Sequence, residues 1–177
     1  MTETRQMNFY ERFFAKSNKT DAILVVDGKK LHVNKALLSY HSDYFEALFN
    51  AEFKEKSMEE IEIKDVTFKD FAILLSLIQK NQLVPSSGKN AENILELANR
   101  FLLPAAKPHV ELFLTNTRMD KFEKLRIADK YDLEHLRKQA IYMYNSKEDF
   151  RQILERTKEF SDNTKAKLYG KYIKLSY

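Results

Sequence analysis

Residues 21–49 read DAILVVDGKKLHVNKALLSYHSDYFEALF, and their pattern predicts how the first third of the chain folds. It opens with DAILVVD, a short apolar run with β-branched members, which predicts a strand. Asp27 and Gly28 supply a two-residue turn and KKLHVN returns as a second strand, so the pattern predicts a β-hairpin. Helical spacing begins at Lys35, and Ser42 is placed to cap a second helix, DYFEALF.

The rest of the chain predicts one more strand and then only helices. IEIKDV (61–66) alternates as a strand does, residues 65–80 carry an apolar stripe at helical spacing, and VPSSGKN (84–90) is a loop. Further helices are expected at 90–103, 106–114, 122–132, 134–145 and 146–157, with a last helix through the lysine-rich tail. Strands followed by helices predict an α+β organisation rather than alternating βαβ units.

Composition limits the class of protein. The 177 residues are 44% hydrophobic and 32% charged, as in ordinary globular domains, and the length suits one domain with an appended helical unit. The absence of cysteine excludes disulfides, thiol catalysis and cysteine-ligated zinc. No apolar run approaches the ~20 residues of a membrane span, and the N-terminus is too polar for a signal peptide. We therefore expect a cytoplasmic or nuclear protein without membrane association.

The net charge of +4 is concentrated at the C-terminus. Residues 163–177 contain no acid and hold Lys165, Lys167, Lys171 and Lys174, with Tyr169, Tyr172 and Tyr177 between them. Aromatic rings among lysines can stack bases beside phosphates, but they also fit an amphipathic, solvated helix. We favour the helix, because the rest of the chain is balanced in charge. Nucleic acid is therefore not an expected partner, and a steep salt dependence of binding would be the sign of that alternative.

The chain carries little that suggests chemistry. Its four histidines are never four residues apart, and neither a metal-binding motif nor a phosphate loop occurs among only three glycines. Ser39 and Ser42 flank His41, but neighbours this close on a helix do not face each other, so helix capping explains them better than catalysis. We expect no enzyme, no catalytic residue, no metal and no cofactor, and a binding module instead.

The opening stretch resembles the core of the BTB/POZ domain. The matching residues are Asp21, Gly28, Lys35, Leu38, Ser42, Phe45 and Phe49, and the resemblance continues to about residue 115. It is similar to the MATH–BTB subgroup, although this chain holds no MATH domain, and Asn34 stands where the family's signature has histidine. The resemblance implies a small three-stranded sheet with clustered helices. It divides the chain into an N-terminal dimerisation helix (1–18), the BTB/POZ domain (19–115) and a helical "3-box" or partial BACK-like extension (116–177).

The resemblance also implies a homodimer. BTB domains commonly dimerise through the N-terminal helix and the first helices of the core. The expected interface residues are Phe9, Phe13, Phe14, Asp21, Lys35 and Leu38, with the three phenylalanines on one face of a short helix and Asp21 and Lys35 in a partly buried ion pair.

A further implication is an adaptor for cullin-3 in ubiquitin ligase complexes. Many BTB proteins bind the N-terminal domain of cullin-3 through an apolar-x-Glu motif, which Phe53, Lys54 and Glu55 match, and Met58 to Glu60 gives an alternative register. Phe45 and Leu48 would extend that surface. An unknown protein substrate would be recruited for ubiquitination. The alternative function is a BTB dimer scaffold in transcriptional regulation that does not bind cullin.

Overall fold

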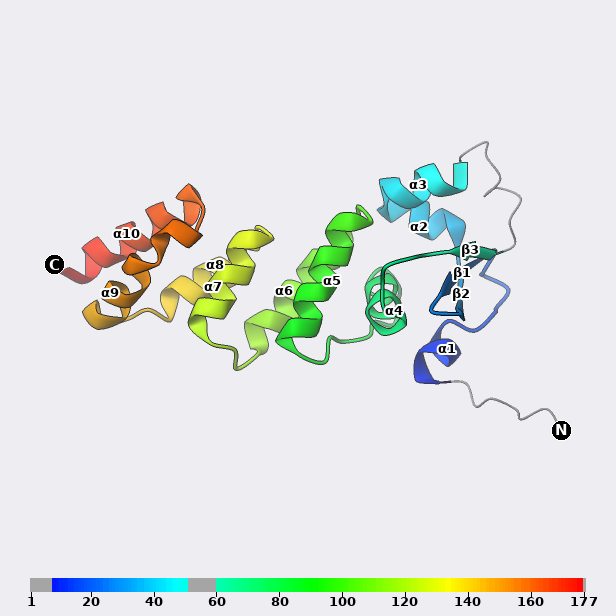
Figure 1. Cartoon of the computed structure of the whole chain (residues 1–177), viewed down its shortest axis with the longest axis horizontal. Coiled ribbons are helices and arrows are strands. Elements are labelled where there is room, and N and C mark those ends of the chain that lie inside the picture. Colours follow the sequence, from blue (N-terminus) through cyan, green and yellow to red (C-terminus); the bar gives the residue numbers. More distant parts are fainter. Residues whose placement is uncertain (1–7, 51–59, 177) are drawn as a thin grey trace. The chain divides into compact units, whose positions relative to one another are not determined.

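The computed structural model describes residues 8–50 and 60–176, which form two compact units (Figure 1). The first unit contains the described residues up to Pro85 together with Asn93–Ala106. The second contains Ser86–Glu92 and the described residues from Lys107 onward.

A three-stranded sheet in the order β2-β1-β3 lies in the first unit. The central strand β1 (Ala22–Val26) pairs antiparallel with β2 (Lys29–Val33) and parallel with β3 (Glu60–Glu62). Asp27 and Gly28 have φ of 49° and 69°, and this left-handed pair is the turn geometry that matches the twist of a hairpin. The predicted hairpin, third strand and α+β class are confirmed.

Helices surround this sheet. They are α1 (Phe9–Phe13), α2 (Lys35–His41), α3 (Asp43–Asn50), α4 (Phe68–Ser76) and α5 (Gly88–Arg100), which ends before a short 3₁₀ turn at Pro104–Ala106. Asn34 begins α2 by accepting a hydrogen bond from the Leu37 N–H at 2.8 Å. Ser42 begins α3 as predicted, since its hydroxyl accepts from the Phe45 N–H at 3.1 Å and donates to the Phe101 carbonyl at 2.6 Å.

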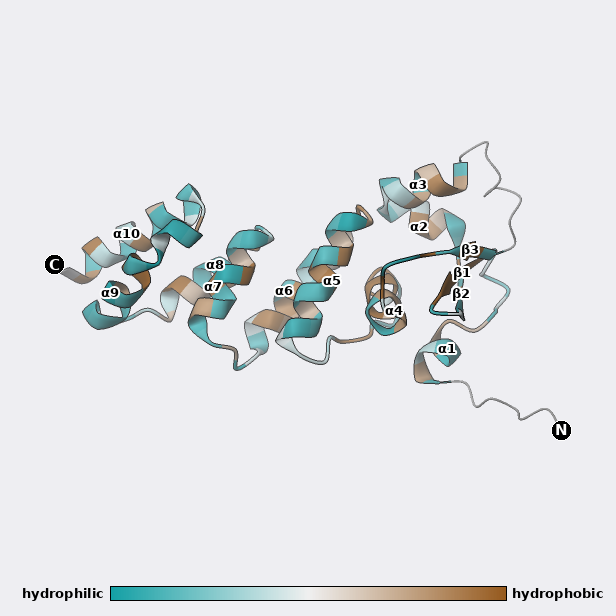
Figure 2. Cartoon of the chain, in the orientation of Figure 1, coloured by the Kyte–Doolittle hydropathy of each residue, from teal (hydrophilic) through white to brown (hydrophobic). Residues whose placement is uncertain are grey.

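Helix α4 is the most buried element of this unit and is shorter than the predicted 65–80. Every residue of it except Lys69 is buried, and Figure 2 shows apolar residues along much of its length. It starts late because Asp65 is in the left-handed region, with φ of 59°. It ends early because the Ser76 hydroxyl accepts from the Leu83 N–H at 2.9 Å, which holds the chain as it turns away. The next helix, α5, then begins inside the predicted 84–90 loop.

The second unit is helical throughout its described part. Its elements are α6 (Lys107–Asn116), α7 (Lys121–Lys130), α8 (Glu134–Tyr142), α9 (Lys147–Glu155), a 3₁₀ turn at Thr157–Glu159 and α10 (Asp162–Ser176). Helices α7 and α8 pack as a hairpin (Figure 1). One apolar cluster from α7 to α10 contains Leu125, Ala140, Ile141, Tyr144, Phe150, Ile153, Phe160 and Leu168. The predicted helices of this region are confirmed, with ends that differ by a few residues.

Candidate protein-interaction surfaces

Helix α1 is held against the hairpin by its own capping and by the residue that follows it. The Asn8 side chain accepts from the Glu11 N–H at 2.9 Å, while the Glu11 carboxylate accepts from the Asn8 N–H at 2.8 Å. Phe14 ends the helix, and its carbonyl accepts from the His32 N–H at 3.0 Å. This short helix is therefore fixed to β2 as one body.

The three phenylalanines of this segment do not share one face. Phe9 is 57% exposed and Phe13 is half-buried, whereas Phe14 is only 2% exposed. The prediction that they form a single apolar face is therefore corrected, since Phe14 belongs to the core. Phe9, with part of Phe13, is left as an apolar surface facing solvent.

Asp21 and Lys35 contact each other differently from the predicted ion pair. The Asp21 carboxylate is exposed and accepts from the backbone N–H of Lys35 at 2.8 Å, at the start of α2. The Lys35 ammonium instead lies 5.7 Å from the centre of the Phe49 ring. Leu38, expected at the interface, is 3% exposed and belongs to the core. Asp21 thus acts as a helix cap that joins β1 to α2.

Of the residues expected to bind cullin, Phe45 is fully buried. Its ring stacks on Phe101 and on Phe49, each at 5.9 Å between centroids, so we assign it to the core rather than to a contact surface. Leu48 is half-buried on α3. Phe53, Lys54 and Glu55, and the alternative start at Met58, lie outside the described residues. Glu60 is described, is exposed and forms an ion pair with Lys30.

Tyr40 is an exposed aromatic residue on α2 that is not one of the six interface residues named above. It is 84% exposed on α2, with its ring 5.0 Å from that of His41. Leu38 and Tyr40 are two positions apart on α2 and point to opposite sides of the helix, so burial of Leu38 leaves Tyr40 exposed. Tyr40 and Phe9 are the most exposed aromatic residues described in the first unit.

Histidine His32, next to α1, is neutral at physiological pH. Burial lowers its pKa, and the positive charges of Lys16 and Lys30 lower it further. Its ring therefore adds no charge to the surface beside Phe14 and β2.

The lysine-rich tail is largely engaged within its own unit. The Lys171 ammonium donates to the carbonyls of Ile141 and Tyr142, at 3.0 and 2.8 Å, and so caps the C-terminal end of α8. Two further lysines form ion pairs: Lys167 with Glu134 at 2.6 Å, and Lys165 with Asp162 at 3.0 Å. The hydrogen bond from Lys167 lowers the pKa of Glu134 to about 2. Helix α10 is exposed along much of its length, with Thr164 and Leu168 buried, and three of its lysines contact groups of the same unit.

Asp129 joins α7 to the start of α10. Its carboxylate accepts from the Ser161 N–H at 2.8 Å, from the Ser161 hydroxyl at 2.5 Å and from the buried Thr164 hydroxyl at 2.6 Å. Burial alone would raise the pKa of Asp129, but these hydrogen bonds and the charge of Arg137 outweigh it and lower the pKa below its ordinary value.

Replacing Asp129 with alanine should lower the free energy of unfolding by about 2 kcal/mol, because the Thr164 hydroxyl would be left buried without its acceptor. Since the folded pKa lies below the unfolded one, the contribution is present above about pH 4 and is lost as the pH falls through the folded pKa. Urea denaturation from neutral to acidic pH measures both effects. Asp129→Asn is the control, as it keeps hydrogen-bonding atoms but cannot ionise. Identical acid dependence in the natural chain and this variant would contradict the assignment.

Metal-ligand clusters and membrane-spanning helices are both absent from the described part of the chain. Residues 8–50 and 60–176 include no cluster of three histidine, aspartate or glutamate residues that could hold a metal ion. Among the helices described, none is both long and apolar enough to cross a membrane.

A model of the BTB/POZ domain family matches residues 10–118. The chain belongs to the BTB/POZ family. This domain is a protein-interaction module and not an enzyme family. The recognition made from the opening stretch is thereby confirmed, whereas the boundaries 1–18, 19–115 and 116–177 stay a prediction.

Two relatives of this BTB/POZ chain come from Caenorhabditis elegans. BTB/POZ domain-containing protein Y57A10B.3 is 36% identical over 168 residues, which cover 93% of this chain and 53% of that protein. BTB and MATH domain-containing protein 36 is 33% identical over 135 residues, which cover 76% of this chain and 42% of that protein. The chain thus spans about half the length of these relatives. The solved structure of the BTB domain of human gigaxonin is also similar. The match covers 57% of this chain and 81% of the gigaxonin chain, with 22% sequence identity and a TM-score of 0.44.

Proposed function

We propose that this protein is a homodimeric BTB adaptor that binds cullin-3 and recruits substrates for ubiquitination in the cytoplasm or nucleus. The observation that carries the proposal is membership of the BTB/POZ family together with an apolar N-terminal helix whose Phe9 is 57% exposed. Exposed aromatic surface on a helix fixed to a folded domain is typical of a contact site.

The dimer in this proposal forms around a two-fold axis. A two-fold contact uses the same patch on both copies, so Phe9 and part of Phe13 would cover their counterparts in the partner. Tyr40, exposed on α2, extends the candidate patch. Asp21 and Lys35 support this surface through the hydrogen bond that joins the start of β1 to α2, and Leu38 supports it from the core.

The cullin surface in this proposal begins at α3 and continues into the following segment. Leu48 is half-buried on α3, so part of its side chain is available to a partner. Phe45 and Phe49, on the same helix, are buried and support it from the core side. Phe53, Lys54 and Glu55 follow within a few residues. A single phenylalanine in a polar stretch suits an anchor that fills a pocket in the partner.

Calorimetric titration with the cullin-3 N-terminal domain tests the adaptor function. Phe53→Ala should weaken binding by about 2 kcal/mol, roughly 30-fold, as expected for an anchor residue. Met58→Ala is the matched control, because the two variants distinguish the registers of the apolar-x-Glu motif. Circular dichroism of each variant verifies its fold.

Each possible result of that titration leads to a different conclusion. A loss on Met58→Ala alone would move the motif to Met58. An absence of binding at high protein concentration would overturn the cullin function and favour the BTB scaffold in transcriptional regulation. The relatives named with a MATH domain support the adaptor class, and the substrate is a protein still to be identified.

A further inference from the structure

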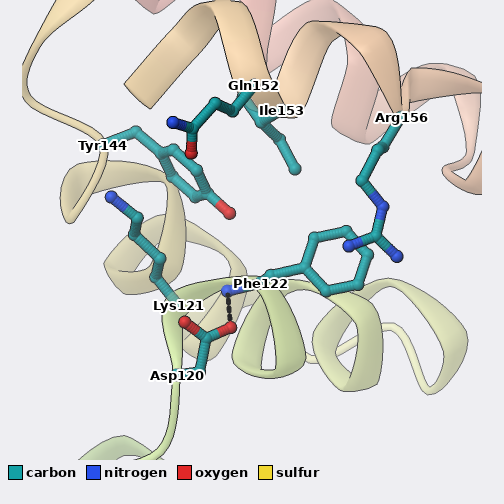
Figure 3. A pocket seen from close by; sticks show the side chains of 7 residues that line it. All are labelled: Asp120, Lys121, Phe122, Tyr144, Gln152, Ile153 and Arg156. Carbon is teal, nitrogen blue, oxygen red and sulfur yellow. Dashed lines mark hydrogen bonds between the residues drawn. The ribbon is translucent and has the colours of Figure 1, made fainter. Parts of the chain in front are cut away.

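A cavity of about 290 Å³ lies within the second unit. It is lined by Asp120, Lys121, Phe122, Tyr144, Gln152, Ile153 and Arg156, which come from the start of α7, the end of the α8 segment and α9 (Figure 3). Phe122, Ile153 and the Tyr144 ring provide its apolar walls. This volume suits one amino-acid side chain with its adjoining backbone rather than a larger ligand.

The Tyr144 hydroxyl marks the cavity as a binding site. Tyr144 is 3% exposed, and Figure 3 shows its hydroxyl directed into the space between Phe122 and Ile153. Within residues 8–50 and 60–176 this hydroxyl makes no hydrogen bond, so it is a donor that faces the cavity and its solvent. A ligand with an acceptor at this point would receive a hydrogen bond from it.

The charges around the cavity select a neutral ligand. The Lys121 ammonium is paired with Asp149, and the Arg156 guanidinium with Glu159 at 2.8 Å. Both cations also lie over aromatic rings: Lys121 is 4.7 Å from the centre of Tyr144, and Arg156 is 3.4 Å from that of Phe122.

The Asp120 carboxylate adds a further negative charge to the lining, where it accepts from the Phe122 N–H at 2.8 Å. Because both cations of the lining are already paired with carboxylates, an anionic ligand would have to compete with Asp149 and Glu159 for them. Burial raises the pKa of Tyr144, and the carboxylates of Asp120 and Asp149 raise it further, so the hydroxyl stays protonated and available as a donor.

We propose that this cavity binds a neutral peptide segment of a partner protein, with an apolar side chain against Phe122 and Ile153 and a main-chain carbonyl that accepts a hydrogen bond from the Tyr144 hydroxyl. This contact uses the second unit alone. It shares no residue with the cullin and dimer surfaces proposed above. An experiment that disproves one proposal therefore leaves the other untouched.

A nuclear magnetic resonance titration of the full chain with N-acetyl-leucine N-methylamide tests the proposal. This probe carries one leucine side chain and two neutral carbonyls. Saturable shifts are expected at the Gln152 side-chain amide and the Ile153 methyl groups. Tyr144→Phe removes only the hydroxyl and should weaken the affinity about tenfold. Tyr142→Phe, at a residue that is 79% exposed, is the matched control and should leave it unchanged.

Two further comparisons make the test decisive. Gln152→Trp places a larger side chain at an exposed position of the lining and should abolish the shifts without disturbing the core. N-acetyl-leucine, with a free carboxylate, should bind more weakly than the neutral amide. The proposal is overturned if the probe causes no saturable shifts, if Tyr144→Phe binds as well as the natural chain, or if the carboxylate binds more tightly.

Discussion

Replacing Phe45 with alanine is expected to lower the free energy of unfolding of the first unit by about 3–5 kcal/mol. Phe45 is fully buried and lies in a group of aromatic rings, 5.9 Å from both Phe49 and Phe101 and 6.5 Å from Phe71. Truncation would remove these contacts and leave a cavity that rigid neighbours cannot close. Urea denaturation at a fixed protein concentration measures the loss, because stability of a dimer depends on concentration.

Leu48→Ala is the matched control for Phe45→Ala. Both residues lie on α3, but Leu48 is only half-buried, so its truncation should cost about 1 kcal/mol. The pair also separates folding from binding, since Leu48→Ala should affect cullin affinity in a chain that remains folded. Equal destabilisation by the two substitutions would show that Phe45 is not part of the core, contrary to its burial.

A single Phe9→Asp substitution is expected to convert the proposed dimer to a monomer. Each two-fold interface contains two copies of Phe9, so an anchor worth about 2 kcal/mol in each copy gives about 4 kcal/mol, or roughly a thousandfold in the dissociation constant. Aspartate in the first turn of α1 favours the helix, so the monomer should keep its fold. Sedimentation equilibrium over a range of concentrations measures the change.

Two variants accompany the Phe9 experiment. Ala15→Asp adds the same charge at a nearby exposed position and should leave the dimer intact. Phe9→Leu keeps an apolar side chain and should weaken the dimer only slightly. If Phe9→Asp sediments as the natural chain does, the proposed interface around α1 is wrong.

The elements that the sequence predicted well are those set by local pattern. The hairpin follows from a short apolar, β-branched run and from the Asp27-Gly28 turn, and α3 follows from apolar spacing after Ser42. The ends of α4 were predicted less well, because they depend on contacts made only in the folded chain. The Ser76 hydroxyl, for example, stops that helix through a hydrogen bond to the Leu83 N–H.

The candidate interface residues show a different limit of sequence reasoning. Phe14, Leu38 and Phe45 are apolar residues at helical spacing, and that pattern fits equally well a core contact and a contact with a partner. Only the three-dimensional packing separates the buried Phe14 from the exposed Phe9. The Asp21 contact with the Lys35 backbone likewise joins residues 14 positions apart, which no local pattern predicts. The Tyr144 cavity was missed because its lining comes from three separate segments.

The two outer strands of the sheet differ in how they are protected against aggregation. On the side of β2 that faces away from β1, the His32 N–H donates a hydrogen bond to the Phe14 carbonyl. That edge is therefore partly covered by the chain itself. The opposite outer strand among the described residues, β3, has two exposed glutamates, Glu60 and Glu62. If two copies of β3 met edge to edge in antiparallel fashion, these carboxylates would lie opposite one another and repel. Within the described sheet, both outer strands thus carry a feature that disfavours strand addition.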